Sequence, residues 1–301
     1  MATLYTHQTS NIWKTWFLMA VFLVLVIAIG WFVSMYFGNP LILYVAVGFA
    51  IFMNVTSYWF SDRLVVAMTG ARPVTRNEHP ELWNVVENLS ITAGLPMPKV
   101  YIVEDTAPNA FATGRNPEHA VVAVTTGLLA ILDRTELEGV VAHELAHIGN
   151  RDMLVSTVAV VLAGFVAIIA DLLMRSMMFG GGDRDNKAGA IFLILGIVGI
   201  ILAPIAAQLI QLAISRKREY LADASGALLT RYPEGLASAL EKISRASRPM
   251  HRANNATAHL FIADPFGGEK KGIGQRIHGL FQTHPDAADR VRILRGMDSG
   301  R

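Results

Sequence analysis

The sequence has 301 residues, of which 52% are hydrophobic and 17% charged, and its mean hydropathy is +0.40. Soluble domains carry about a quarter charged residues, so this composition excludes a wholly soluble protein and a disordered one. The net charge of +2 comes with no cluster of Lys and Arg, and we therefore expect no nucleic-acid partner. Because cysteine is absent, disulfides, thiol catalysis and cysteine-ligated metals are excluded as well.

Four apolar runs predict membrane segments. The first two, residues 16–37 and 41–60, are separated only by residues 38–40 and predict a tight hairpin. Each has about 20 residues, enough to cross about 30 Å of hydrocarbon. The third and fourth runs, residues 153–179 and 188–214, predict a second pair. The alternative for this second pair is two buried core helices of a soluble domain.

Basic residues predict the orientation in the membrane. They follow the second run (Arg63, Arg72 and Arg76) and the fourth run (Arg216, Lys217 and Arg218). The positive-inside rule therefore places the polar regions 61–152 and 215–301 in the cytoplasm of a multi-pass cell-membrane protein. The segment 175–187 also carries three basic residues, although this topology puts it outside. The predicted parts are the hairpin 1–60, the polar regions 61–152 and 215–301, and the membrane segment 153–214.

The polar regions combine short strands with helices. Apolar patterning predicts strands at 100–103 and 120–124, a third strand at 109–113, and helices at 135–149, 216–229 and 233–245. Asp133 and Glu136 have the spacing of a capping box at the start of the first of these helices.

The motif His143-Glu144-Leu145-Ala146-His147 is the main sign of chemistry. On a helix the two histidines lie one above the other, at the spacing that a single zinc ion needs. The opposite face is apolar and predicts burial against a core: Leu137, Val141, Leu145 and Ile148. Glu144 is next to the histidine pair, so it can reach a metal-bound water without being a ligand. The alternative is two surface histidines on an ordinary amphipathic helix.

A catalytic zinc ion needs a third protein ligand and an open position for water. Glu219 and Asp223 follow the fourth apolar run, four residues apart and thus on one helical face. We expect Glu219 to be the third ligand and Asp223 to accept a hydrogen bond from a ligand imidazole, with Asp223 as the alternative ligand.

Together these motifs resemble the HtpX family of bacterial membrane metalloproteases, which are relatives of the CAAX prenyl proteases. The resemblance rests on H-E-L-A-H at 143–147, S-R-K-R-E-Y-L-A-D at 215–223 and T-H-P-D-A-A-D-R at 283–290, and it covers nearly the whole chain. It implies a mainly α protein, with membrane-embedded helices and a cytoplasmic α+β domain of the zincin type (gluzincin-like) that carries a small β-sheet. It also implies a zinc endopeptidase that degrades damaged or misassembled membrane proteins, often in a stress response.

The resemblance assigns further roles residue by residue. His143, His147 and Glu219 match the ligands of one zinc ion per chain, and Glu144 matches the catalytic base. His284 and Arg290 match a late pair near the site that stabilises the oxyanion, although His284 also fits a surface histidine before a helix. The segment Asn109, Ala110, Phe111 and Ala112 resembles an edge strand that binds the substrate peptide, or else an ordinary hairpin strand.

A membrane scaffold with a structural zinc ion is the alternative function. Structural zinc sites are usually closed by a fourth ligand and have no use for a glutamate at position 144. The expected partners of the enzyme are membrane-protein or peptide substrates and the lipid bilayer, and the sequence leaves the oligomeric state open.

Overall fold

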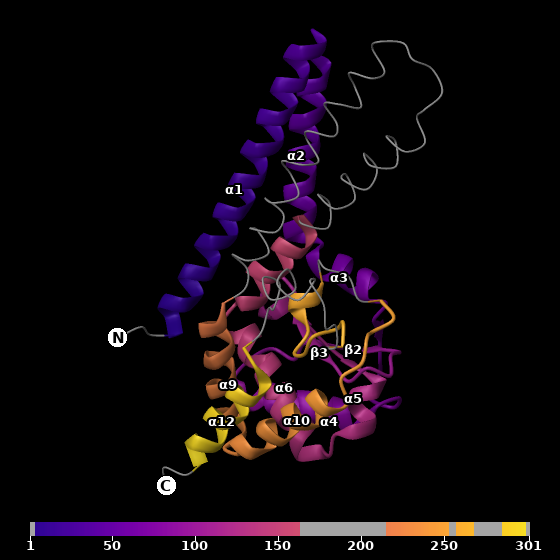
Figure 1. The fold of residues 1–301 in the computed structure, drawn as a ribbon, viewed down its shortest axis with the longest axis vertical. Coiled ribbons are helices and arrows are strands. Elements are labelled where there is room, and N and C mark those ends of the chain that lie inside the picture. The colour runs from indigo at the N-terminus through magenta and orange to yellow at the C-terminus, as the bar shows by residue number, and fades with distance from the viewer. Residues whose placement is uncertain (1–3, 163–214, 253–256, 268–284, 299–301) are drawn as a thin grey trace, which may run out of the picture.

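The computed structural model describes residues 4–162, 215–252, 257–267 and 285–298. Within these ranges the chain forms a long helical hairpin and a helical body that holds one small sheet (Figure 1). The principal helices are α1 (Leu4–Phe37), α2 (Leu41–Trp59), α3 (Ser61–Thr69), α4 (Pro80–Ala93), α5 (Thr126–Ile131), α6 (Arg134–Gly149), α9 (Arg216–Thr230), α10 (Pro233–Arg245) and α12 (Ala287–Asp298). The strands are β1 (Arg72–Pro73), β2 (Lys99–Val103), β3 (Ala110–Thr113) and β4 (Val121–Thr125).

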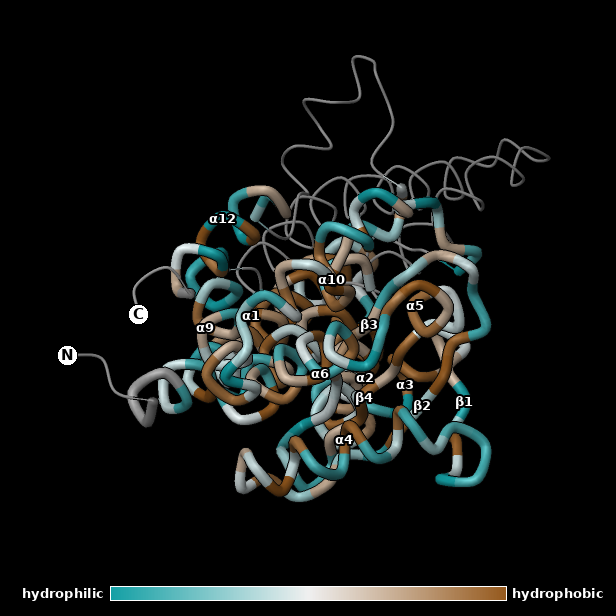
Figure 2. The backbone as a smooth tube through the Cα atoms, turned by 90° about the horizontal axis from the view of Figure 1, so that it is seen from below, coloured by the Kyte–Doolittle hydropathy of each residue, from teal (hydrophilic) through white to brown (hydrophobic). Residues whose placement is uncertain are grey.

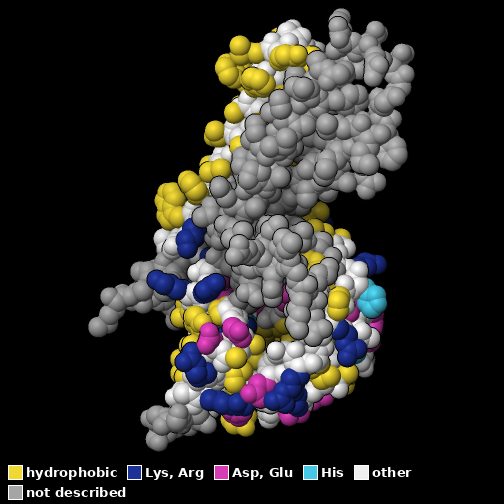
Figure 3. All heavy atoms as spheres, in the orientation of Figure 1, with side chains coloured by type: hydrophobic (Ala, Val, Ile, Leu, Met, Phe, Trp, Pro, Cys, Tyr) yellow, Lys and Arg dark blue, Asp and Glu magenta, His cyan; other side chains and the backbone are white. Residues whose placement is uncertain are grey.

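Helices α1 and α2 lie side by side and project away from the body (Figure 1). The segments Gln8–Phe37 and Leu41–Trp59 are long and apolar enough to cross a membrane. Large apolar side chains remain exposed along both helices, as Figure 3 shows at the far end of the hairpin; they include Trp16, Phe17, Trp31, Tyr44 and Phe52. An apolar surface of this extent suits hydrocarbon better than water. The two predicted N-terminal spans are thus confirmed as helices.

The third apolar run begins as a separate helix, Asp152–Leu162, whose axis is bent by 82° from that of α6. Residues 163–214, which hold the rest of the third run and all of the fourth, lie outside the described residues. The second predicted membrane pair therefore stays a prediction, and so do the boundaries of the four predicted parts.

The sheet has the strand order β1-β2-β4-β3. Strands β2 and β4 are parallel, whereas β3 runs antiparallel to β4 and forms one edge. All three strands predicted from the sequence are confirmed, with bounds that differ by one residue at most. Hydrophobic segments gather around the sheet and the inner helices, while the connecting loops are hydrophilic (Figure 2).

The helices of the body also agree with the sequence. Helix α6 begins at Arg134, one residue before the predicted start, and the capping box of Asp133 and Glu136 is present with both of its hydrogen bonds. The predicted helices at 216–229 and 233–245 correspond to α9 and α10. A mainly helical chain with a small mixed sheet confirms the predicted fold class.

Candidate metal centre

The two histidines of α6 face away from the apolar core, because the opposite side of the helix packs into it. Leu137, Val141, Leu145 and Ile148 are all buried, as the periodicity predicts. This leaves His143 and His147 on the face that turns toward α9. His143 is itself 1% exposed, so its imidazole is shielded from bulk water.

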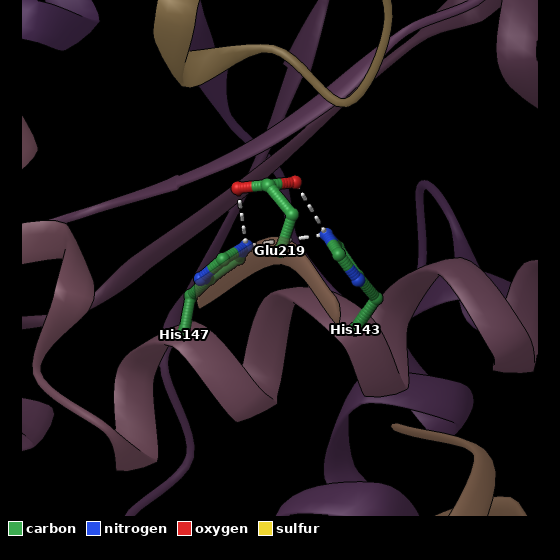
Figure 4. Close-up of side chains that lie close together, drawn as sticks. All are labelled: His143, His147 and Glu219. Atoms are coloured by element: carbon green, nitrogen blue, oxygen red, sulfur yellow. Dashed lines mark hydrogen bonds and ion pairs between the residues drawn. The ribbon is translucent and has the colours of Figure 1, made fainter. Parts of the chain in front are cut away.

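Helix α9 supplies the third donor. It packs closely on α6 because Gly226 has no side chain: a Cβ there would lie 3.0 Å from the backbone nitrogen of His143. Glu219, in the first turn of α9, consequently reaches both imidazoles (Figure 4). Its carboxylate oxygens lie 3.8 Å from His143 Nε2 and 3.6 Å from His147 Nε2.

The three donor atoms fit one metal ion. The Nε2 atoms of His143 and His147 are 3.1 Å apart, close to the separation of about 3.3 Å between two nitrogens that each lie about 2.0–2.1 Å from a tetrahedral zinc ion. The donor atoms of the two histidines and Glu219 all fall within 4.8 Å of one another. Two imidazoles and one carboxylate are also the ligand set of many catalytic zinc sites. Among the residues that the structure describes, His143, His147 and Glu219 form the group of side chains that could hold a metal ion.

The outer nitrogen of His143 is bound to a buried ion pair. Its Nδ1–H donates to Asp223 at 3.0 Å, which directs Nε2 toward Glu219. Arg290, from α12, in turn donates to both carboxylate oxygens of Asp223, at 2.6 and 2.8 Å. The expected contact of Asp223 with a ligand imidazole is thus present in the structure.

The outer nitrogen of His147 has a partner that the sequence did not reveal. Its Nδ1–H donates to Asp152 at 3.2 Å. Asp152 stands just beyond the bend after α6, and Arg218 Nε lies 3.4 Å from the same carboxylate. A carboxylate five residues after a histidine is not on the same helical face, so helical periodicity gave no signal for it. An acidic residue directly after the motif helix is the one sign that could have pointed to it.

The pKa values of the two histidines are shifted in opposite directions. Burial lowers the pKa of His143 to about 4, against the pull of Asp223. Burial also acts to lower the pKa of His147, but the hydrogen bond to Asp152 and the charges of Glu219 and Glu144 raise it to about 9. Burial acts to raise the pKa of Asp223 too, and Arg290 with His143 nevertheless holds it at about 2.

Glu144 is buried beside the three donors without belonging to them. Its side chain is 2% exposed, and this burial raises its pKa to about 7, with a further increase from the charge of Glu219. The charges of His147 and Arg290 and the backbone of Ala112 in β3 act to lower this pKa. A carboxyl group with a pKa near neutrality is suited to take up and return a proton.

Strand β3 forms the edge of the sheet, where the sequence placed a substrate-binding strand. Asn109 and β3 are buried. Ile262 N–H donates to Ala110 O at 2.9 Å, and the Asn109 side chain exchanges two hydrogen bonds with the backbone of Ala263. Phe111 stacks edge-on against Phe261. The segment around Ile262 therefore occupies the first half of this edge, and the predicted binding of substrate there stays a prediction.

The late His/Arg pair is described only in part. His284 lies outside the described residues. Arg290 is 1% exposed and lies 3.5 Å from His143 Nδ1, but its guanidinium is directed at Asp223. The structure thus brings Arg290 to the site, while its predicted role at the oxyanion stays a prediction.

Comparison with known proteins identifies relatives of this chain. Residues 76–298 match the profile of Peptidase family M48. The chain is 46% identical over 297 residues to a protein named "Protease HtpX homolog" from Tropheryma whipplei (strain Twist), with 98% of each chain covered. A protein of the same name from Pyrococcus furiosus is 50% identical over 284 residues, with 94% of each covered. The crystal structure of S. mikatae Ste24p aligns with 96% of this chain and 67% of that one, at 16% identity and a TM-score of 0.49.

The family match and the relatives agree on the same kind of protein. The family profile covers most of the chain, including all three metal donors. The named relatives match it over nearly its entire length. The chain therefore belongs to peptidase family M48 and, with these relatives, to the HtpX family of membrane metalloproteases.

Proposed function

We propose that this protein is a zinc endopeptidase in which His143, His147 and Glu219 hold the metal and Glu144 is the general base. The observation that supports this most directly is the convergence of the three donors next to a buried glutamate that is not one of them and whose pKa is raised to about 7. Zinc bound at these donors would lower the pKa of a water molecule to about 7 and polarise the scissile carbonyl. The alternative, a structural metal, offers no reason to bury a carboxyl group at position 144.

The side chains of the site have separate tasks in this proposal. Glu144 accepts a proton from the attacking water and passes it to the leaving amine, since its pKa is close to the operating pH. Asp223 and Asp152 hold the two imidazoles by their Nδ1 atoms and so present Nε2 to the metal. We assign stabilisation of the oxyanion to His284, whereas the contacts of Arg290 support a role in fixing Asp223.

The substrates in this proposal are damaged or misassembled membrane proteins and peptides released from them. The apolar hairpin supports a site close to the bilayer. Strand β3 is an edge strand, and its main chain beyond Ala110 would bind an extended peptide with little regard for the side chains of that peptide. We further propose a multi-pass inner-membrane protein with its active site in the cytoplasm, as the distribution of Arg and Lys supports. Activity under stress is the physiological role that the resemblance suggests.

The Glu144→Gln variant tests the proposed function. We expect the purified full-length variant to hold about one zinc ion per chain, because Glu144 is not a metal ligand in this proposal. We expect it to have lost peptide hydrolysis, because glutamine cannot accept the proton of the attacking water. Glu138→Gln is the matched control, because Glu138 lies on the same helix but pairs with Arg134 at the surface. Metal analysis and hydrolysis of a fluorogenic peptide measure the two properties. Retained turnover in the zinc-loaded Glu144→Gln protein would contradict the proposal.

A further inference from the structure

The first membrane helix contacts the polypeptide directly behind the metal centre. Asn11 of α1 is 3% exposed. Its side-chain amide donates to Asp152 Oδ1 at 2.7 Å and to the backbone carbonyl of Asn150 at 3.1 Å. One turn earlier, Gln8 donates to the backbone carbonyl of Gly149 at 2.7 Å. The three acceptors lie at the last residue of α6 and in the bend that follows it.

The residues of α1 that make this contact belong to a buried face of the helix. Asn11, Thr15, Leu18 and Phe22 recur at helical spacing and are all buried. Leu18 and Phe22 belong to apolar clusters with residues of the helix Asp152–Leu162. An amide in so apolar a helix is costly unless it is hydrogen-bonded, and Asn11 has two acceptors. The membrane helix and the bend are therefore held in a defined register.

Asp152 connects this contact to a metal donor. One of its oxygens, Oδ2, accepts the hydrogen bond from His147 Nδ1, and the other, Oδ1, accepts the hydrogen bond from Asn11. The helix that carries Asp152 is turned by 82° from α6, and Arg151 between them has a left-handed backbone with φ of 57°. Since α6 alone does not fix the carboxylate of Asp152, its position depends on Arg218 and on Asn11.

We propose that Asn11 is a positioning residue of the metal centre, which it completes from the membrane hairpin by holding Asp152 against His147. The inference rests on the proposed function only in that His147 is taken as a metal ligand. It assigns to the hairpin a role beyond anchoring, because the geometry of a ligand depends on a side chain of a membrane-spanning helix.

The effect of Asn11 on metal affinity follows from its distance to the metal. Loss of a group bonded directly to a ligand typically lowers metal affinity 10–100-fold. Asn11 is one bond further out, and Arg218 also contacts Asp152. We therefore expect its removal to weaken zinc binding about three- to tenfold.

The experiment compares three full-length variants in detergent. Asn11→Leu removes the bond to Asp152 while keeping the size of the side chain. Gln8→Leu removes a bond to the same bend that does not involve Asp152. Thr15→Val is the control on the same buried face, because the Thr15 hydroxyl donates to the backbone of its own helix. Zinc affinity is measured by competition with a chelator, the cobalt-substituted protein provides an absorption spectrum of the ligand field, and thermal unfolding of the metal-free protein reports folding.

The expected result is a three- to tenfold loss of zinc affinity and an altered cobalt spectrum in Asn11→Leu, with both properties unchanged in Thr15→Val. A decrease in Gln8→Leu would be smaller. If Asn11→Leu does not fold, Asn11→Ala tests the same contact, since it removes the amide and brings no larger or charged group next to Asp152. A wild-type affinity and spectrum in a folded Asn11 variant would overturn the inference alone, whereas a wild-type protein that binds no zinc would overturn the proposed function with it.

Discussion

The two histidines of the metal centre lie on one helix, yet the structures that support them come from different regions of the molecule. His143 is held inside the protease body by Asp223 of α9 and Arg290 of α12. His147 is held where the helical hairpin meets the body, by Asp152, which has Arg218 and Asn11 as its partners. The side chain of His143 is 1% exposed and that of His147 is 15% exposed.

The same pair of groups, an imidazole and a carboxylate, produces opposite pKa shifts in these two regions. Asp223 shares its charge with a guanidinium that binds both of its oxygens, so burial dominates and lowers the pKa of His143 to about 4. Asp152 meets Arg218 through a single contact of 3.4 Å, and its charge adds to that of Glu219 to raise the pKa of His147 to about 9. The charge of the nearby His147 lowers the pKa of His143 further, so each shift depends on all the charges around the imidazole and not on its carboxylate alone.

Breaking the support of His143 is expected to have the largest effect. Arg290→Leu leaves the carboxylate of Asp223, which is 1% exposed, without its counter-charge. Removal of one partner of a buried ion pair typically costs about 3–5 kcal/mol, and we expect a loss of this size in the free energy of unfolding. Chemical unfolding of the metal-free protein in detergent measures it.

Arg292→Leu is the control for this prediction. Arg292 is on the same helix, but its side chain is 77% exposed and pairs with Asp289 at the surface. Exposed ion pairs contribute little to stability, so this variant should unfold like the wild type. An Arg290→Leu protein that is as stable as the Arg292→Leu protein would show that Asp223 does not depend on its buried partner.

The second prediction compares the two carboxylates directly. Asp223→Asn and Asp152→Asn each remove the charge that orients one imidazole, and each should lower zinc affinity about 10–100-fold. Asp223→Asn should also lower stability, because it leaves Arg290 buried without a counter-charge. Chelator competition and unfolding of the same preparations separate the two effects.

A double variant sharpens this comparison. In an Asp152→Asn background, Asn11→Leu should have little further effect on zinc affinity, since the group that Asn11 holds has lost its charge. In an Asp223→Asn background, Asn11→Leu should keep its full three- to tenfold effect. Equal effects of Asn11→Leu in the two backgrounds would mean that the hairpin does not act through Asp152.

Local patterns explain how much of this site could be predicted. The spacing of His143, Glu144 and His147 on one helix, and the capping box at Asp133, are encoded within a few residues, and both are present in the structure. Glu219 was found because it lies one turn from Asp223 on a predicted helix. Short apolar runs likewise predict the strands, because each strand is encoded within a few neighbouring residues.

Contacts across the chain could not be predicted in this way. Asn11 and Asp152 are separated by 141 positions, and Arg290 and Asp223 by 67. The bend at Arg151 has no periodic signal, because a left-handed residue other than glycine or asparagine is uncommon and has no sequence signature of its own. The family resemblance placed Arg290 near the site, but only the packing of α12 shows which group it binds.

The third prediction uses pH to distinguish the two histidines. Because the pKa of His147 in the metal-free protein is raised from 6.5 to about 9, this imidazole carries a proton on Nε2 below pH 9 that zinc must displace. His143, with a pKa of about 4, has no such proton above pH 5. Zinc affinity should therefore increase by up to about tenfold per pH unit between pH 6.5 and 9, as one proton is released on binding.

The stability of the metal-free protein should change in the opposite direction. A raised pKa means that protonated His147 stabilises the fold; this contribution is fully present below pH 6.5 and is lost as the pH rises through about 9. In Asp152→Asn the pKa of His147 should be lower, so both pH dependences should move to lower pH, whereas Asp223→Asn should leave them in place. Chelator competition and thermal unfolding from pH 6 to 9.5 measure the two trends. A zinc affinity that is constant over this range in the wild type would show that His147 is already neutral and that the two supports are electrostatically alike.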